Sequence, residues 1–106
     1  MSMTLRKLEE QIESLKQQLL ALGPMRPGSL SKQYRQPKTK RRPFYQLSYT
    51  HRMRSRSEYV RPEDLAVLRR ETAAFRRFKT LVRRWIELSL KASQFRVRKA
   101  HMPPEH

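Results

Sequence analysis

Cysteine is absent from the 106-residue chain, so the sequence offers no disulfide, no thiolate zinc site and no thiol nucleophile. Glycine occurs only twice, which leaves no glycine-rich loop to hold a nucleotide phosphate. The histidines are His51, His101 and His106, and the only aspartate is Asp64. No carboxylate pair, Ser/His/Asp set or metal-spaced cluster can be assembled from these residues. We therefore predict a protein that is not an enzyme and uses no cofactor, metal or small-molecule substrate.

Long apolar runs are also lacking, because no stretch approaches the ~20 apolar residues that a membrane-spanning helix needs. Residues 1–23 mix glutamates with arginine and lysine, a composition that excludes a signal peptide. We expect a cytoplasmic protein, associated with the nucleoid or with another nucleoprotein. Binding of the cationic side chains to an anionic lipid surface is an alternative, but we favour no membrane partner.

Acidic residues are few: 9 aspartates and glutamates accompany 25 lysines and arginines, for a formal charge of +16. The excess is uneven, since residues 1–23 sum to 0, residues 24–62 to +10 and residues 63–106 to +6. A charge of this size is far more than solubility requires and favours a polyanionic partner. The second and third segments are therefore the expected contact surface for a nucleic acid. DNA and RNA, single-stranded or double-stranded, all fit this chemistry.

Residues 4–22 contain a leucine seam, in which apolar residues stand alternately three and four positions apart. The seam consists of Leu5, Leu8, Ile12, Leu15, Leu19 and Leu22. This spacing is the a/d pattern of a coiled coil and predicts a helix of roughly five turns. Gly23 is placed for a left-handed C-terminal cap, and Pro24 cannot continue the helix. We expect the seam to contact either another helix of this chain or a partner protein.

Residues 24–61 lose the helical pattern and are rich in proline, serine, arginine and aromatic side chains. Tyr45, Leu47 and Tyr49 alternate with polar residues, which predicts a strand, and residues 54–60 form a second extended run. Together the two runs predict a β-hairpin.

The segment before this hairpin, residues 36–43, has two prolines, four basic residues and no apolar side chain. We expect a flexible loop whose function is electrostatic. Phe44, Tyr45 and Tyr49 follow these cations. Basic groups beside aromatic rings suit backbone contact with base stacking, but rings also cover the inner face of a hairpin. We favour the inner face for all three rings.

The third segment predicts one long helix, residues 62–97. Pro62 fits the first helical position, and Glu63 and Asp64 favour the positive end of the helix dipole. Apolar residues recur at seven-residue intervals in three columns, which form one wide face for packing on a core. Residues 99–106 are expected to be a disordered tail.

Arginine pairs recur at intervals of seven along this helix, and seven residues are almost two helical turns. The pairs therefore stack as a stripe of roughly 33 Å along one side. A solvated face without a partner is the alternative interpretation, but the shortage of acids and the fit of guanidinium to phosphate favour nucleic acid. The arginine stripe consists of Arg69, Arg70, Arg76, Arg77, Arg83, Arg84 and Lys91, and the loop and hairpin add Lys38, Lys40, Arg41, Arg42, Arg52, Arg54 and Arg56 as predicted nucleic-acid-binding residues.

Three short motifs follow one another: GSLSKQY at residues 28–34, PFYQLSY at 43–49, and YVRPE at 59–63, which runs into the long helix. They resemble an uncharacterised family of short, basic prokaryotic proteins that are associated with mobile elements and sometimes labelled transposase-related. The resemblance covers roughly residues 26–92 and implies an architecture more than an activity. Typical members carry a cysteine-rich insert, similar to a small zinc-binding loop, where this chain has only the cysteine-free residues 35–43.

We predict an α+β fold in a single small domain, residues 1–98. Residues 4–22 and 62–97 are expected to form a two-helix antiparallel coiled-coil-like hairpin, with the basic loop and β-hairpin of residues 24–61 inserted between the helices. The predicted function is non-catalytic binding to the phosphate backbone of a nucleic acid, as an accessory factor of a mobile element. The alternative is an assembly or adaptor subunit that dimerises or docks on a larger protein through its leucine seam, within a nucleoprotein complex. Binding to an acidic protein surface is a third interpretation of the charge.

Overall fold

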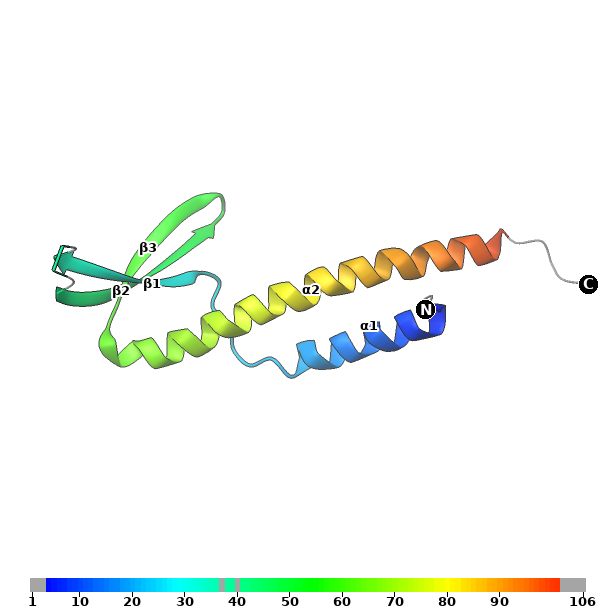
Figure 1. Ribbon diagram of the computed structural model, residues 1–106, viewed down its shortest axis with the longest axis horizontal. Coiled ribbons are helices and arrows are strands. Elements are labelled where there is room, and N and C mark those ends of the chain that lie inside the picture. Colours follow the sequence, from blue (N-terminus) through cyan, green and yellow to red (C-terminus); the bar gives the residue numbers. More distant parts are fainter. Residues whose placement is uncertain (1–3, 37, 40, 102–106) are drawn as a thin grey trace, which may run out of the picture. The chain divides into compact units, whose positions relative to one another are not determined.

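The chain is an α+β protein with two α-helices and a three-stranded antiparallel sheet (Figure 1). The computed structural model describes residues 4–36, 38–39 and 41–101, with only the backbone described at Arg41. The elements are α1 (Leu5–Leu20), β1 (Ser29–Gln36), β2 (Arg41–His51), β3 (Arg54–Val60), a 3-10 turn (Pro62–Asp64) and α2 (Leu65–Ala100). Contacts divide the chain into two compact units. The helical unit combines α1 with α2 from Phe78 onward, and the sheet unit is Gly23–Arg77. The extent of the single predicted domain stays a prediction.

Helix α1 begins at a side-chain cap. The Oγ1 atom of Thr4 accepts a hydrogen bond of 3.2 Å from the backbone N–H of Lys7, which satisfies one of the free amides of the first turn. The helix ends at Leu20, and its C-terminal cap is Ala21, in right-handed helical geometry. The predicted left-handed cap at Gly23 was therefore wrong, because the helix stops before the chain reaches that glycine.

The core of the helical unit is an apolar cluster between the leucine seam and α2. Leu8, Ile12 and Leu15 from α1 are buried there, and Leu5, Leu19 and Leu22 pack against them partly exposed. The partners on α2 are Leu81, Leu88 and Ala92, with Trp85 and Phe95 beside them. An ion pair of 3.2 Å joins Glu9 to Arg96 at one end of this cluster. Burial of a leucine side chain stabilises a fold by about 1.5–3 kcal/mol, so this cluster holds α1 in place.

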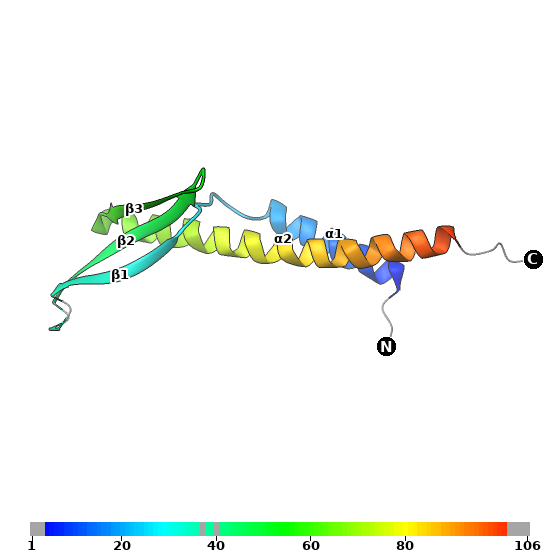
Figure 2. The same ribbon diagram turned by 90° about the horizontal axis from the view of Figure 1, so that it is seen from above.

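The sheet has the strand order β1-β2-β3, with β2 in the middle (Figure 2). The predicted hairpin is confirmed as β2 and β3, in which Tyr45 pairs with Val60 and His51 with Arg54. Strand β1 was not predicted, because its sequence SLSKQYRQ is mostly polar and has no apolar alternation. It is held by antiparallel pairing with β2 from Ser29↔Ser48 to Gln36↔Arg41.

This pairing also changes the predicted flexible loop at residues 36–43. Gln36 ends β1 and Arg41 begins β2, so the connection is a short hairpin turn, in which Pro37 and Lys40 lie outside the described residues. Pro43 is accommodated inside β2 because β3 pairs with β2 only from Tyr45 onward. A proline there removes an N–H at a position where β2 has one neighbour instead of two.

Positive φ angles occur at Gly28, at Arg42 (φ 56°) within β2 and in the β2–β3 turn. Gly28 enters β1 with φ 134°, and a Cβ atom added there would lie 2.8 Å from the carbonyl oxygen of Ser48. The β2–β3 turn consists of Arg52 and Met53, with φ 51° and 65°. Positive φ at both positions of a two-residue loop matches the twist of the strands, but it is a conformation that favours asparagine and glycine. This turn lacks both residues, which explains why the sequence signal for it was weak.

The core of the sheet unit is small. Leu47 and Val60 are buried on one face of the sheet, and Thr72 of α2 is 1% exposed. The buried hydroxyl of Thr72 donates a 2.8 Å hydrogen bond to the carbonyl of Leu68, one turn earlier, so it is not left unpaired. The linker after α1 is fixed by a 3.0 Å hydrogen bond from the N–H of Arg26 to the carbonyl of Glu71.

Helix α2 is preceded by the 3-10 turn Pro62–Asp64, in which proline stands at the first positions as expected. The α-helix itself runs from Leu65 to Ala100. Lys99 and Ala100 are thus helical, and the predicted disordered tail from residue 99 began too early. Residues 102–106 of that tail lie outside the described residues. None of the described helices combines the length and the hydropathy needed to cross a membrane.

Candidate nucleic-acid interface

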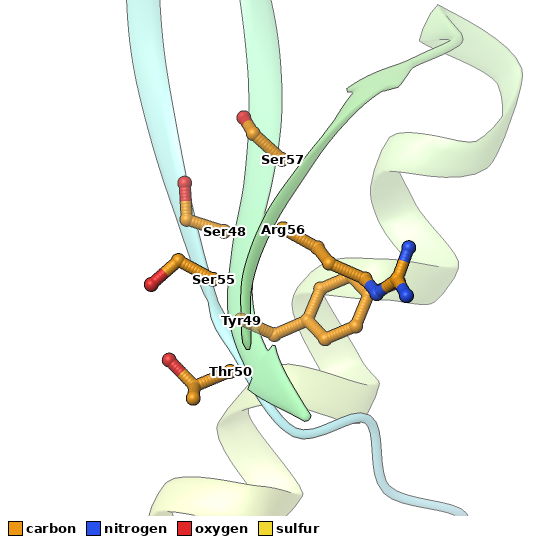
Figure 3. Close-up of a pocket in the computed structure, with 6 residues that line it drawn as sticks. All are labelled: Ser48, Tyr49, Thr50, Ser55, Arg56 and Ser57. Atoms are coloured by element: carbon orange, nitrogen blue, oxygen red, sulfur yellow. The ribbon is translucent and has the colours of Figure 1, made fainter. Parts of the chain in front are cut away.

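The two faces of the sheet differ in chemistry because side chains alternate along each strand. The inner face carries Leu47 and Val60, which are buried. The outer face is the opposite one, and its cross-strand pairs include Ser48↔Ser57, Gln46↔Tyr59 and Gln33↔Phe44. Figure 3 shows the alternation at the β2–β3 end, where Tyr49 and Arg56 point to one side of the sheet and the hydroxyls of Ser48, Thr50, Ser55 and Ser57 to the other.

On the inner face, Tyr49, Glu58 and Arg26 form a polar cluster. The hydroxyl of Tyr49 donates a 2.7 Å hydrogen bond to Oε1 of Glu58, and Arg26 pairs with Oε2 at 3.2 Å. The guanidinium of Arg26 also lies 4.8 Å from the centre of the Tyr49 ring. The hydrogen bond from Tyr49, reinforced by Arg26, lowers the pKa of Glu58 below its usual 4.5. The same bond raises the pKa of Tyr49 above 10.0. This cluster therefore stabilises the sheet and is not free for a ligand.

The basic residues predicted for the loop and hairpin gather at the two ends of the sheet. Lys38 and Arg42 belong to the β1–β2 end, and both are exposed. Arg52, Arg54 and Arg56 belong to the β2–β3 end and are exposed as well. The side chains of Lys40 and Arg41 lie outside the described residues. At about 3.3 Å per residue, the 11-residue strand β2 separates these two basic ends by roughly 35 Å.

The arginine stripe lies on α2, and all seven of its residues are exposed. Arg69, Arg70, Arg76 and Arg77 belong to the sheet unit, and Arg83, Arg84 and Lys91 to the helical unit. Within each unit, members of the stripe that stand seven residues apart lie almost two helical turns apart on one side of α2.

The members of the stripe have different environments. Arg69 donates a 2.9 Å hydrogen bond to the hydroxyl of Tyr45 and lies 5.2 Å from the centre of its ring, so it also holds α2 to the sheet within the sheet unit. Arg84 pairs with Glu87 at 3.4 Å. In the part of the chain that the structure describes, Arg70, Arg76 and Arg83 have no acidic side chain within ion-pair distance.

The leucine seam, predicted as a partner surface, is occupied by α2 of the same chain. Leu8 is fully buried, and Ile12 and Leu15 are 9% and 7% exposed. Other apolar residues are open instead: Ile86, Leu90 and Val97 on α2 are 65%, 61% and 54% exposed. Their spacing of four and seven places them on one side of the helix.

Two ring positions depart from the sequence prediction. Tyr45 and Tyr49 lie on the inner face as expected, but Phe44 lies on the outer face, opposite Gln33. Tyr59, which the sequence had not suggested as a site residue, is on the same face at 57% exposure, with its ring centre 6.4 Å from that of Phe44. The guanidinium of Arg35 lies 5.3 Å from the Phe44 ring. The alternation of side chains along β2 already placed Phe44 on the face opposite Tyr45. The position of Arg35 could not be inferred from the sequence, because strand β1 was not predicted.

Groups suited to metal binding do not gather in the structure: within residues 4–36, 38–39 and 41–101, no three His, Asp or Glu side chains come together to hold an ion. What the site offers chemically is therefore cations, hydroxyls, amides and two outward-facing rings.

Fold and site together define a class, that of small α+β proteins with a three-stranded antiparallel sheet and an arginine-rich exposed surface. The chain belongs to the family described as a domain of unknown function, DUF6788, whose model matches residues 5–70, more than half of the sequence. This agrees with the uncharacterised family expected from the sequence. The match starts in α1, earlier than the predicted resemblance, and ends near the beginning of α2. No curated protein and no solved structure matches the chain.

Proposed function

We propose that this chain is a non-catalytic nucleic-acid-binding protein that contacts the phosphate backbone through the arginine stripe and the basic ends of the sheet. The observation that carries the proposal is the exposure of Arg70, Arg76 and Arg83 with no acidic partner among the described residues. Guanidinium groups in this state pair readily with phosphate oxygens, because their charge is not already compensated. The net charge of +16 supports the same partner.

The proposal also includes three more detailed expectations from the sequence. They are the two-helix antiparallel coiled-coil-like hairpin with the β-hairpin between its helices, a cytoplasmic or nucleoprotein-associated location, and service as an accessory factor of a mobile element. In this setting the cysteine-free segment of residues 35–43 keeps a basic contact where relatives are expected to carry a cysteine-rich insert. The absence of an assembled acid–base or nucleophilic set in the sequence supports a binding role.

The test is fluorescence anisotropy with labelled duplex DNA, single-stranded DNA and RNA at about 50 and 200 mM salt. Six to ten phosphate contacts would weaken binding by about 10³ or more over this range. The test variant replaces Arg70, Arg76 and Arg83 with glutamine. The matched control removes the same charge from α1 by replacing Arg6, Lys7 and Lys16 with glutamine.

The proposal predicts that the triple substitution on α2 weakens binding at least tenfold more than the control on α1. It also predicts a salt slope reduced by about one for each lost phosphate contact. Equal losses for both triples would instead describe a generic polycation and contradict the proposal.

A second candidate function is an assembly or adaptor subunit. The exposed stripe of Ile86, Leu90 and Val97 favours it, since α2 already covers the leucine seam of α1. Light scattering after size-exclusion chromatography measures the mass of the protein in solution and shows whether the chain assembles as a homodimer. If the native chain is a monomer at all concentrations and Leu90→Glu leaves its mass unchanged, self-assembly through this stripe is contradicted. A dimer that dissociates on Leu90→Glu substitution would support it.

A further inference from the structure

The outer face of the sheet is polar, weakly covered and unlike the inner face. Ser48, Ser57 and Thr50 are exposed, and Tyr59 is 57% exposed, whereas Leu47 on the inner face is 1% exposed. Cross-strand pairs place Ser31 beside Gln46, Gln46 beside Tyr59, and Ser48 beside Ser57. Side chains on this face are thus short hydroxyls and amides, which both donate and accept hydrogen bonds.

Two rings stand on this polar face. Phe44 and Tyr59 are diagonal neighbours across β2 and β3, with ring centres 6.4 Å apart and planes tilted by 37°. Neither ring is needed for the buried core of the sheet unit, whose members Leu47 and Val60 lie on the other face. Tyr59 is 57% exposed, and Phe44 is half-buried. The accessible part of each ring offers a π-face to a flat ligand, and nucleic-acid bases are such ligands.

A cation lies beside one of these rings, and others stand at the ends of the sheet. The guanidinium of Arg35 lies 5.3 Å from the Phe44 ring, and exposed cations stand at both ends of the sheet, Lys38 and Arg42 at one end and Arg52 at the other. A strand running along the sheet would therefore meet positive charge at both ends and rings between them. This charge selects a polyanion over an apolar peptide as the occupant.

Base stacking selects among polyanions. A duplex keeps its bases stacked on one another, so only an unpaired strand can place a base on Phe44 or Tyr59. The hydroxyl and amide groups of Ser31, Gln46, Ser48 and Ser57 add a further criterion. The 2′-hydroxyl of ribose is both donor and acceptor and is the group by which proteins distinguish RNA from DNA.

We propose that the outer face of the β1–β2–β3 sheet binds single-stranded RNA, with bases stacked on Phe44 and Tyr59 and the backbone held by Arg35 and the basic ends of the sheet. This inference rests on the proposed function and names its ligand class. It goes beyond phosphate contact, since it assigns a base-stacking site to a face that the sequence prediction left without a role.

The experiment uses the full chain and a fluorescein-labelled RNA of about ten nucleotides, within the usual site size of sheet modules that bind single strands. The comparison ligands are DNA of the same sequence and the same RNA annealed to its complement. The variants are Phe44→Leu, Tyr59→Leu and their combination. The matched control is Tyr34→Leu, which removes a ring paired with Pro43 on the inner-face side of β1. Phe44→Trp tests rescue, because tryptophan keeps a stacking surface.

The proposal predicts that single-stranded RNA binds more tightly than the other two ligands. Each leucine substitution should weaken RNA binding about tenfold, within the range of about 5-fold to 150-fold that one stacked base provides, and leave duplex binding unchanged. Tyr34→Leu and Phe44→Trp should bind RNA like the native chain. A second readout is 2-aminopurine in the RNA, whose emission should change on binding to the native chain and not to the double leucine variant.

The outcomes separate the two levels of the argument. If the double leucine variant binds RNA normally while Arg70, Arg76 and Arg83 substitution weakens all ligands, the stacking site is overturned and the proposed function stands. Single-stranded DNA bound as tightly as RNA would overturn the assignment to RNA. Absence of salt-dependent binding to every polymer would overturn the proposed function and this inference with it. Melting curves of each variant by circular dichroism show whether a loss of binding comes from unfolding.

Discussion

The hydroxyl of Tyr49 lies 2.7 Å from Oε1 of Glu58, a diagonal contact between β2 and β3 that Arg26 completes from the linker. The contact thereby holds the linker residue Arg26, 32 positions before Glu58, to the β2–β3 hairpin on the inner face of the sheet. We expect Tyr49→Phe to lower the melting temperature of the sheet at neutral pH, because the carboxylate loses its hydrogen-bond donor. Circular dichroism of the native and variant chains measures this change.

The same contact makes stability depend on pH. The pKa of Glu58 is lower in the folded chain than its usual 4.5, so its stabilisation is present above about pH 4.5 and is lost as the pH falls below that value. The pKa of Tyr49 is raised above 10.0, so its share is present below about pH 10 and is lost above it. Glu58→Gln should flatten the acidic part of the melting-temperature profile. Parallel profiles for the native chain and this variant would contradict the assignment.

Gly28 and Gly23 form a matched pair. Gly28→Ala places a methyl group 2.8 Å from the Ser48 carbonyl oxygen and forces alanine to φ 134°. We expect a loss of about 1–3 kcal/mol in the free energy of unfolding. Gly23→Ala has nothing within 4 Å of the new methyl group and should leave stability unchanged or raise it by up to about 1 kcal/mol. Denaturant titration measures the free energy of unfolding of both variants. Equal changes in the two variants would contradict the close approach of the Gly28 backbone to the Ser48 carbonyl oxygen.

The β2–β3 turn should be open to improvement. Met53 is 98% exposed and has φ 65°, which costs a side chain with Cβ more than glycine. Met53→Gly should therefore raise the free energy of unfolding by about 0.5–1 kcal/mol. Ser57→Gly, at an exposed position inside β3, should lower it by a similar amount. A stability gain from both glycines would mean that the turn is not the cause.

Leu8 and Leu20 test which side of α1 carries the core. Leu8 is fully buried, and Leu20 is 79% exposed. Leu8→Ala should destabilise the helical unit by about 2–4 kcal/mol, whereas Leu20→Ala should change stability by less than about 0.5 kcal/mol. Thermal melts followed at 222 nm measure both. Similar small losses would indicate that α1 does not pack on α2 through its leucine seam.

Arg69 and Arg76 separate structure from binding within the arginine stripe. Arg69→Gln should lower stability by about 1 kcal/mol, because it removes both the hydrogen bond and the cation–π contact with Tyr45. Arg76→Gln should leave stability within about 0.5 kcal/mol of the native value while weakening nucleic-acid binding. If Arg76→Gln instead destabilised the chain as much as Arg69→Gln, the stripe would be structural at both positions.

The helices were predictable from sequence because each carries a complete periodic signal. The leucine seam repeats along the whole of α1, and α2 has no glycine or proline between Leu65 and Ala100. The β2–β3 hairpin was predictable from the alternation of Tyr45, Leu47 and Tyr49. Local pattern is sufficient where every second or every third and fourth residue is buried.

Strand β1 and the environment of Arg69 were not predictable, because each depends on residues distant in the sequence. Strand β1 is polar and becomes a strand through its pairing with β2. Arg69 donates a hydrogen bond to Tyr45, which lies 24 positions earlier in the chain, and no periodic spacing relates the two residues. Phe44 is a different case: the alternation placed it on the outer face, and a general preference for buried rings led us to the wrong side.

Pro43 lies at an open edge of β2, and this position affects how the sheet can meet other molecules. Strand β3 begins its pairing with β2 at Tyr45, so one side of β2 near Pro43 has no strand neighbour among the residues that the structure describes. A strand of another molecule that approached this gap would find no N–H at Pro43 and an exposed arginine at Arg42 next to it. Proline and charge at an open edge are the means by which proteins prevent strands of different molecules from joining. At this edge, the proline and the arginine thus disfavour growth of the sheet between molecules.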